Sequence, residues 1–406
     1  MFSDWICPGQ HGDLSMMRSA LIQSLINQLQ SWMDQTRQQA TEPEEVLKNP
    51  PEAQLTDLQR AAGQLPVPLP YSDTVQTALT VAVTRWREQV EAENSLVITA
   101  PPSEPLGDIL RSILRHWPQV DVELLQPLDT YVRPADPLGI RSQLQETLGQ
   151  ATEETAPQNS DDDQAKLAAR RQVVLIPALE ECFLRCIQGW RSIEYLQHLV
   201  VQDTSRFWVI GCSTWSWAFL DRVCHIGAYL EQLQPLPSMK AEELEAWLEP
   251  LIKAVDATAG EVEEQDSGEH TSWGTLAHLS DGMGAIATQL WLRCLGVRQE
   301  DLPADEQPNP PQELPLHPRK PVLPSLPSLI PMDRYLLHSL LIHRYLTRSQ
   351  LALSLGESET VVRSRVQILT REGVIVHQAN RLTVNPIHYP RLRSELSNNN
   401  FLIGQD

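Results

Sequence analysis

Residues 99–110 contain the first side chains whose types and spacing could support chemistry. They read Thr-Ala-Pro-Pro-Ser-Glu-Pro-Leu-Gly-Asp-Ile-Leu and follow an apolar run that predicts a buried strand. A tight turn between a strand and a helix is where backbone N–H groups can hold a phosphate group. Such a site also needs a lysine and a hydroxyl for Mg²⁺, and no lysine lies between Lys48 and Lys166. The turn therefore has the position of a phosphate loop without its cation.

A second candidate is a nucleophile at residues 211–215, Gly-Cys-Ser-Thr-Trp, between a predicted strand and a predicted helix. A nucleophile elbow needs glycine at its last position, and the bulk of Trp215 would clash there. His225 and His270 could be proposed as bases, but no acid partner or oxyanion loop can be assigned. Cys212 as the nucleophile meets the same objections, so acyl transfer is not predicted.

The third candidate is a group of arginines near the C-terminal end. Residues 359–372 have helical spacing, with a buried stripe expected at Val362, Val366 and Leu369. The hypothesised DNA contacts are Arg363, Gln367, Arg371 and Arg381. The alternative is that these are ordinary solvated arginines on a protein-docking module, and Glu357 and Glu359 would repel DNA.

Composition limits the partners. The 406 residues are 41% hydrophobic and carry a net charge of −20, which favours a folded protein and argues against nucleic-acid binding by the whole chain. From Leu326 onward, nine Arg and no Lys face six acidic residues, so any nucleic-acid contact falls to this segment. The six Cys form no C-x-x-C pair and are expected to be free thiols, without a metal site. No apolar run spans a membrane, and the first residues do not form a signal peptide, which predicts a cytoplasmic protein.

Strands and helices alternate through the middle of the chain. Strands are expected at 96–99, 120–125, 171–176 and 206–211, and helices at 106–117, 179–201 and 215–223. Glu180 and Glu181 are expected to be solvated on the second of these helices. Apolar strands that alternate with helices predict a parallel sheet that is covered on both faces. The fold class is therefore α/β.

The flanking segments complete the predicted organisation. Ten prolines within 302–331 predict an extended tether, and the order helix, short helix, helix, hairpin that follows it is that of a winged helix. The predicted division is an N-terminal amphipathic helix at 1–40, a linker with a short helix at 41–69, a core at 70–237 with a disordered acidic loop at 150–165, a helical lid at 238–300, a Pro-rich linker at 301–331, a winged helix at 332–396 and a tail at 397–406.

The order of these parts resembles the AAA+ and STAND P-loop ATPases over about residues 70–295. Residues 99–110 align without gaps with the family's phosphate loop, T-G-P-P-G-S-G-K-S-T-L-L. Three further segments are similar to its Walker B strand, its sensor 1 strand and its G-x-P lid motif, and these are residues 173–181, 207–214 and 279–287, with Gly284 where proline would stand. A winged helix is the usual continuation in STAND regulators and archaeal origin-recognition ATPases. The resemblance implies a P-loop NTPase-like core.

The departures from the family pattern imply a pseudo-ATPase. The degenerate phosphate-loop positions are Ala100, Ser103, Glu104, Pro105, Leu106 and Gly107. Pro177 stands at the Walker B Asp, and sensor 1 has only small hydroxyls such as Ser213. Phosphoryl transfer depends on charge stabilisation that these residues do not supply. We therefore expect no catalytic residue, no cofactor and no metal, and expect that the chain is not an enzyme.

The resulting functional prediction is an inactive AAA+/STAND-like regulatory or scaffolding protein that acts through protein contacts, within an assembly of related ATPases. The first alternative is a transcription regulator that binds DNA through its winged helix. The second alternative is an atypical ATP-binding ATPase. The predicted partner is a protein of unknown identity, with oligomerisation expected and no membrane insertion.

Overall fold

A five-stranded parallel sheet forms the centre of the molecule. The computed structural model describes residues 47–118, 122–153, 163–259, 273–302 and 313–404. The sheet has the order β2–β3–β4–β1–β5, and each neighbouring pair is parallel. Its strands are β1 (Ser95–Ala100), β2 (Glu123–Leu125), β3 (Gln172–Ile176), β4 (Arg206–Ser213) and β5 (Leu233–Pro235). The carboxyl ends of β1, β3 and β4 therefore meet at one edge of the sheet, which we call the carboxyl edge.

Two inner strands, β1 and β4, have the burial that is typical of a parallel sheet covered on both faces. Every residue of β1 and β4 is buried, because both faces of these strands are covered. Ser95 lies opposite Trp208, and Ala100 lies opposite Ser213. This register brings the turn after β1 beside the end of β4.

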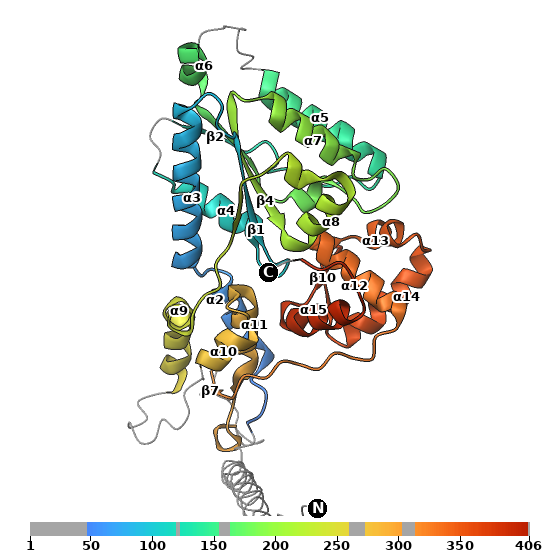
Figure 1. The fold of residues 1–406 in the computed structure, drawn as a ribbon. Coiled ribbons are helices and arrows are strands. Elements are labelled where there is room, and N and C mark those ends of the chain that lie inside the picture. The colour runs from blue at the N-terminus through green and yellow to red at the C-terminus, as the bar shows by residue number, and fades with distance from the viewer. Residues whose placement is uncertain (1–46, 119–121, 154–162, 260–272, 303–312, 405–406) are drawn as a thin grey trace, which may run out of the picture.

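Helices cover both faces of the sheet, as the alternating pattern predicts (Figure 1). On one side lie α3 (Leu69–Glu88) and α4 (Leu106–Arg115), with the short α6 (Asp163–Ala169) near the end of α3. On the other lie α5 (Pro137–Glu153), α7 (Arg191–Gln202) and α8 (Thr214–Cys224), which is followed by η2 (Ile226–Ala228). The predicted α/β class, with a parallel sheet that is covered by helices on both faces, is confirmed.

The long helix expected at 179–201 is wrong, because the chain forms two separate elements there. A short 3-10 turn, η1 (Leu179–Cys182), follows β3, and α7 begins only at Arg191. Between them the Leu184 N–H donates to the Gly189 carbonyl at 3.0 Å and closes a loop. A Cβ at Gly189 would lie 2.2 Å from the Leu184 carbonyl oxygen, so this close approach requires glycine.

A group of helices lies beyond the carboxyl edge, on the side of α3. It contains α2 (Glu52–Ala62), α9 (Ala241–Ala259), α10 (Trp273–Leu279) and α11 (Gly284–Cys294), and we call α9–α11 the lid helices. Short pairings continue this region, with β6 (Leu295–Gly296) against β7 (His317–Pro318), and η3 (Gln299–Asp301) nearby in sequence. The segment before α2 also contacts this region, because Lys48 forms an antiparallel bridge with Val297.

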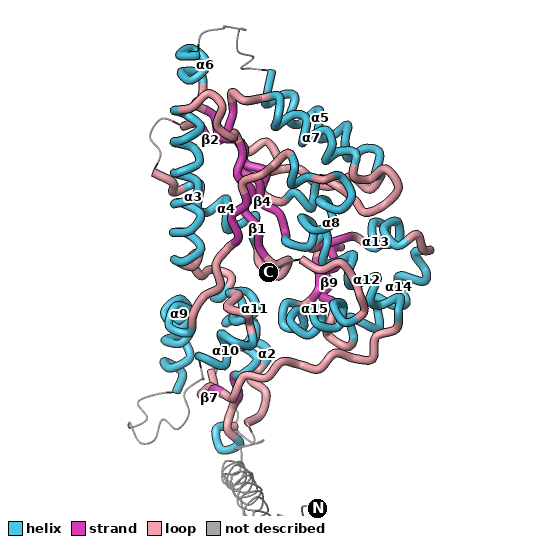
Figure 2. The backbone as a smooth tube through the Cα atoms, viewed as in Figure 1, coloured by secondary structure: helices cyan, strands magenta, loops and turns pink. Residues whose placement is uncertain are grey.

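Residues 331–404 form a further compact group, which we call the C-terminal module. It consists of α12 (Pro331–His343), β8 (Tyr345–Leu346), α13 (Arg348–Leu355), α14 (Glu359–Arg371), β9 (Ile375–Gln378), β10 (Arg381–Val384), η4 (Pro386–His388) and α15 (Tyr389–Asn398). The strands form an antiparallel sheet in the order β8–β10–β9. The buried residues of α14 are Val362, Val366 and Leu369, as the helical spacing predicts. Figure 2 shows this module packed beside α8, at the carboxyl edge.

Several expected features lie outside the described residues. These are the N-terminal helix at 1–40 and most of the acidic loop at 150–165, of which the structure describes only the ends of α5 and α6. Part of the Pro-rich linker is likewise not described. Within the described ranges, no helix is long and apolar enough to cross a membrane.

Candidate functional site

The turn after β1 is the position where the sequence places a phosphate loop. Two of its N–H groups are used inside the turn: Glu104 N donates to Pro101 O at 3.0 Å, and Leu106 N donates to Glu104 O at 2.8 Å. Pro105, which precedes α4, has no N–H to donate. The Leu106 side chain is buried, and a Cβ on Gly107 would lie 3.3 Å from the Pro177 carbonyl oxygen. The turn therefore does not fit the triphosphate that the AAA+ resemblance implies.

Glu104 is the most unusual residue of this turn. Its side chain is 2% exposed, and its Oε1 accepts a hydrogen bond from the Ala285 N–H at 3.0 Å. Ala285 lies in the first turn of α11, where the helix dipole and free N–H groups favour an anion. Burial raises the pKa of Glu104 to about 7, against the opposing effects of this hydrogen bond and of the Arg344 charge. A side chain of the core thus caps a lid helix.

The end of β3 corrects the expectation for Glu180. Instead of being solvated on a helix, Glu180 is 1% exposed within η1. Its Oε2 accepts from Ser213 N at 3.2 Å, and its Oε1 lies 3.6 Å from Arg344 Nη1. Burial raises the pKa of this carboxyl, and the Arg344 charge opposes the rise. The carboxylate joins β3, β4 and the C-terminal module.

The end of β4 contains the residues that the sequence offered as a sensor or nucleophile. Ser213 Oγ accepts from Ser216 N at 3.1 Å and donates to Ser216 Oγ at 2.9 Å, so it serves as the N-cap of α8. Cys212 is buried, and burial raises the pKa of its thiol well above the ordinary value. His225 follows α8 in a left-handed conformation on the surface, and His270 lies outside the described residues. The structure brings together no hydrolytic triad among the described residues.

Arg344 belongs to the C-terminal module, and its side chain lies at the carboxyl edge of the sheet, beside Glu180. It follows α12 with φ 58° and ψ −48°, a backbone conformation that side chains rarely adopt. Its side chain is 23% exposed and lies close enough to Glu104 and Glu180 to influence both carboxyls. No sequence pattern marks this residue, because its position depends on how the module docks on the core.

Arg133 is a second residue that sequence reasoning missed. It is 3% exposed, and its guanidinium donates to the carbonyl oxygens of Glu180 at 2.6 Å, Glu181 at 3.2 Å and Tyr345 at 3.3 Å. Burial lowers the pKa of Arg133. One buried cation therefore ties the loop after β2 to both η1 and the module.

Further contacts hold the module against the core. The imidazole of His343, which is fully buried, accepts from Arg185 N at 3.1 Å. Trp215 Nε1 donates to Tyr389 Oη at 2.8 Å, which joins α8 to α15. A Cβ on Gly404 would lie 2.6 Å from Thr214 Oγ1, so the last described residues pass closely over the start of α8. Burial lowers the pKa of His343 well below its ordinary value, which keeps the imidazole neutral.

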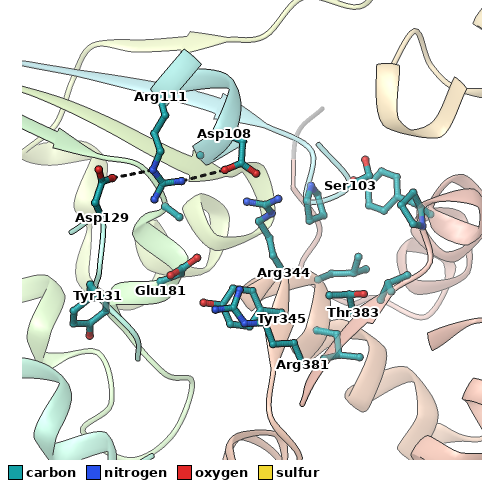
Figure 3. Close-up of a pocket in the computed structure, with 18 residues that line it drawn as sticks. Ser103, Asp108, Arg111, Asp129, Tyr131, Glu181, Arg344, Tyr345, Arg381 and Thr383 are labelled. Atoms are coloured by element: carbon teal, nitrogen blue, oxygen red, sulfur yellow. Dashed lines mark hydrogen bonds and ion pairs between the residues drawn. The ribbon is translucent and has the colours of Figure 1, made fainter. Parts of the chain in front are cut away.

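A pocket of about 390 Å³ lies between the turn after β1 and the C-terminal module (Figure 3). Arg111 is held there by Asp108 at 3.2 Å and Asp129 at 3.0 Å. Arg344 points into the centre of the view, and Glu181 lies beside it. No group of residues suited to a metal ion occurs within the described parts of the chain.

The four residues proposed for DNA contact do not lie together. Arg363, Gln367 and Arg371 are exposed on α14, where the sequence expects them. Arg381 instead lies over the Tyr345 ring, 4.1 Å from its centre, and lines the pocket beside the core. Arg381 is therefore separated from the other three, and its contact with DNA stays a prediction.

Comparison with known proteins finds no match among family models and none among curated sequences. Similar solved structures include Cdc6p from Pyrobaculum aerophilum, at 12% identity and TM-score 0.33, covering 83% of this chain and 96% of that one. An ORC2 protein from Aeropyrum pernix, with ADPNP and ADP, has 11% identity and TM-score 0.31 over 88% and 96% of the chains. The RuvB branch migration motor of Thermotoga maritima has 16% identity and TM-score 0.30 over 79% and 94%.

These similarities correct one prediction. The expectation that the chain is not an enzyme is contradicted, because the similar structures include a branch migration motor and a protein in complex with ADPNP and ADP. At TM-scores near 0.3, the same similarities say nothing of what this chain binds or turns over.

Proposed function

We propose that this chain is an AAA+-like regulatory or scaffolding protein that acts through protein contacts. In this proposal the carboxyl edge joins the core, the lid helices and the C-terminal module into one unit. The observation that carries the proposal is the hydrogen bond from Ala285 to Glu104, in which a side chain of the core occupies the anion-favouring end of α11. The partner is a protein, and an assembly with related ATPase subunits is the setting that the AAA+ resemblance implies.

The charges around Glu104 support the same proposal. Arg344 lies 3.6 Å from Glu180, and Arg133 donates to backbone oxygens of both the core and the module. These contacts use groups of the chain alone, and in this proposal they hold the three parts together without a ligand. A preformed arrangement lowers the ordering cost of binding a partner.

The experiment measures distance changes between the lid helices and the module in the full chain. Fluorophores attached through unnatural amino acids at Glu245 and Glu372, both exposed, report this distance by energy transfer. We expect the same transfer with and without ATP and Mg²⁺, and a broader distribution in Glu104→Ala. The matched control is Asp108→Ala, whose side chain is 82% exposed on the neighbouring helix. An ATP-dependent change in transfer would contradict the proposal.

DNA binding by the C-terminal module is a second candidate, favoured by one observation. Arg348, Arg363 and Arg371 line a groove of about 380 Å³ that no acidic side chain lines. Within the described chain none of these three arginines has an ion pair, which leaves their charges available for phosphates.

Retention of the full chain on duplex DNA at increasing salt tests this candidate. Replacing Arg363 and Arg371 with Ala removes two phosphate contacts, so we expect elution at lower salt and a salt slope smaller by about 2. Arg222→Ala, an exposed arginine on α8, is the control and should leave elution unchanged. No retention of the unaltered chain at low salt would exclude DNA binding.

A further inference from the structure

We propose that the pocket between the turn after β1 and the C-terminal module binds a small zwitterion of the free amino acid type, with its carboxylate at Arg344 and its ammonium at Glu181. The pocket of about 390 Å³ falls within the range of small-molecule sites. This inference concerns a ligand and is independent of the scaffolding proposal.

The first step rests on polar atoms that line the pocket. Four polar atoms of lining residues are buried, and none has a hydrogen-bond partner among the described residues: Ser103 Oγ, Tyr131 Oη, Tyr345 Oη and Arg344 Nε. More than nine tenths of buried polar groups in proteins are hydrogen-bonded, so four such atoms around one pocket indicate a site that a polar molecule completes. Tyr131 is only 8% exposed, so bulk water does not readily form a hydrogen bond with its hydroxyl.

The second step is the balance of charge. Three guanidiniums and three carboxylates line the pocket, and they belong to Arg111, Arg344, Arg381, Asp108, Asp129 and Glu181. Arg111 is neutralised by its two aspartates. A ligand with net charge of either sign would meet repulsion from half of these groups, whereas a zwitterion matches both signs.

The third step is the placement of the charges. Figure 3 shows Glu181 on one side of Arg344 and Ser103 on the other. A ligand carboxylate can accept from Arg344 Nε and from the Ser103 hydroxyl, and charge-assisted bonds of this kind are the stronger ones. The ammonium is then directed toward Glu181. Arg344 comes from the module and Ser103 from the core, so the ligand would contact both.

The experiment is calorimetric titration of the full chain with each of the twenty L-amino acids, alongside acetate, methylammonium and ATP. We expect at least one amino acid to bind in the submillimolar range, and acetate and methylammonium to bind at least tenfold more weakly. Arg344→Gln and Glu181→Gln should each weaken binding at least tenfold. Arg363→Gln on the exposed face of α14 is the control and should leave it unchanged.

Two results would overturn the inference. One is that none of the twenty amino acids binds at 10 mM, and the other is that binding survives both Arg344→Gln and Glu181→Gln. Because Arg344 also pairs with Glu180, its replacement could disturb folding. Glu181→Gln leaves the backbone oxygen that Arg133 uses intact, so it provides an arm that does not depend on Arg344. If no amino acid binds but ATP does, which is a case of the first result, the pocket is assigned to a nucleotide.

Discussion

At the carboxyl edge of the sheet, Glu104, Glu180 and Arg133 are almost fully buried and bond to other groups of the chain. On α14, Arg363 and Arg371 are exposed and have no ion pair within the described residues. The polar groups of the first region hold parts of the molecule together through buried hydrogen bonds, whereas the arginines of the second remain exposed to solvent or to a partner. Substitutions at the two regions should therefore differ in their effect on folding.

Arg133→Met should have the largest effect on stability. It leaves three buried carbonyl oxygens without their cationic donor, so we expect the free energy of unfolding to fall by about 4 kcal/mol. Denaturant titration followed by circular dichroism measures this change. The control is Arg115→Met at the exposed end of α4, and an equal loss in both variants would contradict the role assigned to Arg133.

Glu104→Gln should change the pH dependence of stability. Because burial raises the folded-state pKa from 4.5 to about 7, the folded chain holds a proton that the unfolded chain loses, and stability falls as pH rises between these values. Gln can still accept from Ala285 but does not ionise. The variant should flatten this fall and be more stable above pH 7 by about 3 kcal/mol. Parallel pH profiles for both proteins would contradict this account.

A pair of arginines on α14 sharpens the comparison within one helix. Arg365 donates at 2.8 Å and 2.6 Å to Asp333, which is fully buried, whereas Arg363 faces outward. Arg365→Ala leaves a buried carboxylate unpaired and should cost about 2 kcal/mol of unfolding free energy. Arg363→Ala should change it by less than about 0.5 kcal/mol. Thermal unfolding of both variants measures these two free-energy changes. Similar losses in the two variants would mean that the outer face of α14 also makes stabilising contacts.

The sequence predicts the features that depend on local periodicity. The strands of the core and the stripe of Val362, Val366 and Leu369 follow from apolar spacing, and the structure has them. The burial of Glu180 could not be predicted, because it depends on Ser213 and Arg344, which are distant in sequence. The break before α7 cannot be predicted, because Gly189 is required there only by its close approach to the Leu184 carbonyl oxygen in the folded chain.

The candidate site shows the same limit. The sequence identifies the turn after β1 and the absence of its lysine, since both are matters of residue type. It does not reveal that the Glu104 carboxylate meets the first turn of α11, because that contact joins residues that are 181 positions apart. Contacts between parts that are distant in sequence leave no periodic signal in either part.

The central claim is that Glu104 holds the lid helices on the core without a ligand. Hydrogen exchange at the Ala285 amide tests it most directly, because this N–H donates to Glu104. We expect slow exchange in the full chain without nucleotide and faster exchange in Glu104→Ala, with Asp108→Ala unchanged. Rapid exchange at Ala285 that slows only after ATP and Mg²⁺ are added would contradict the claim.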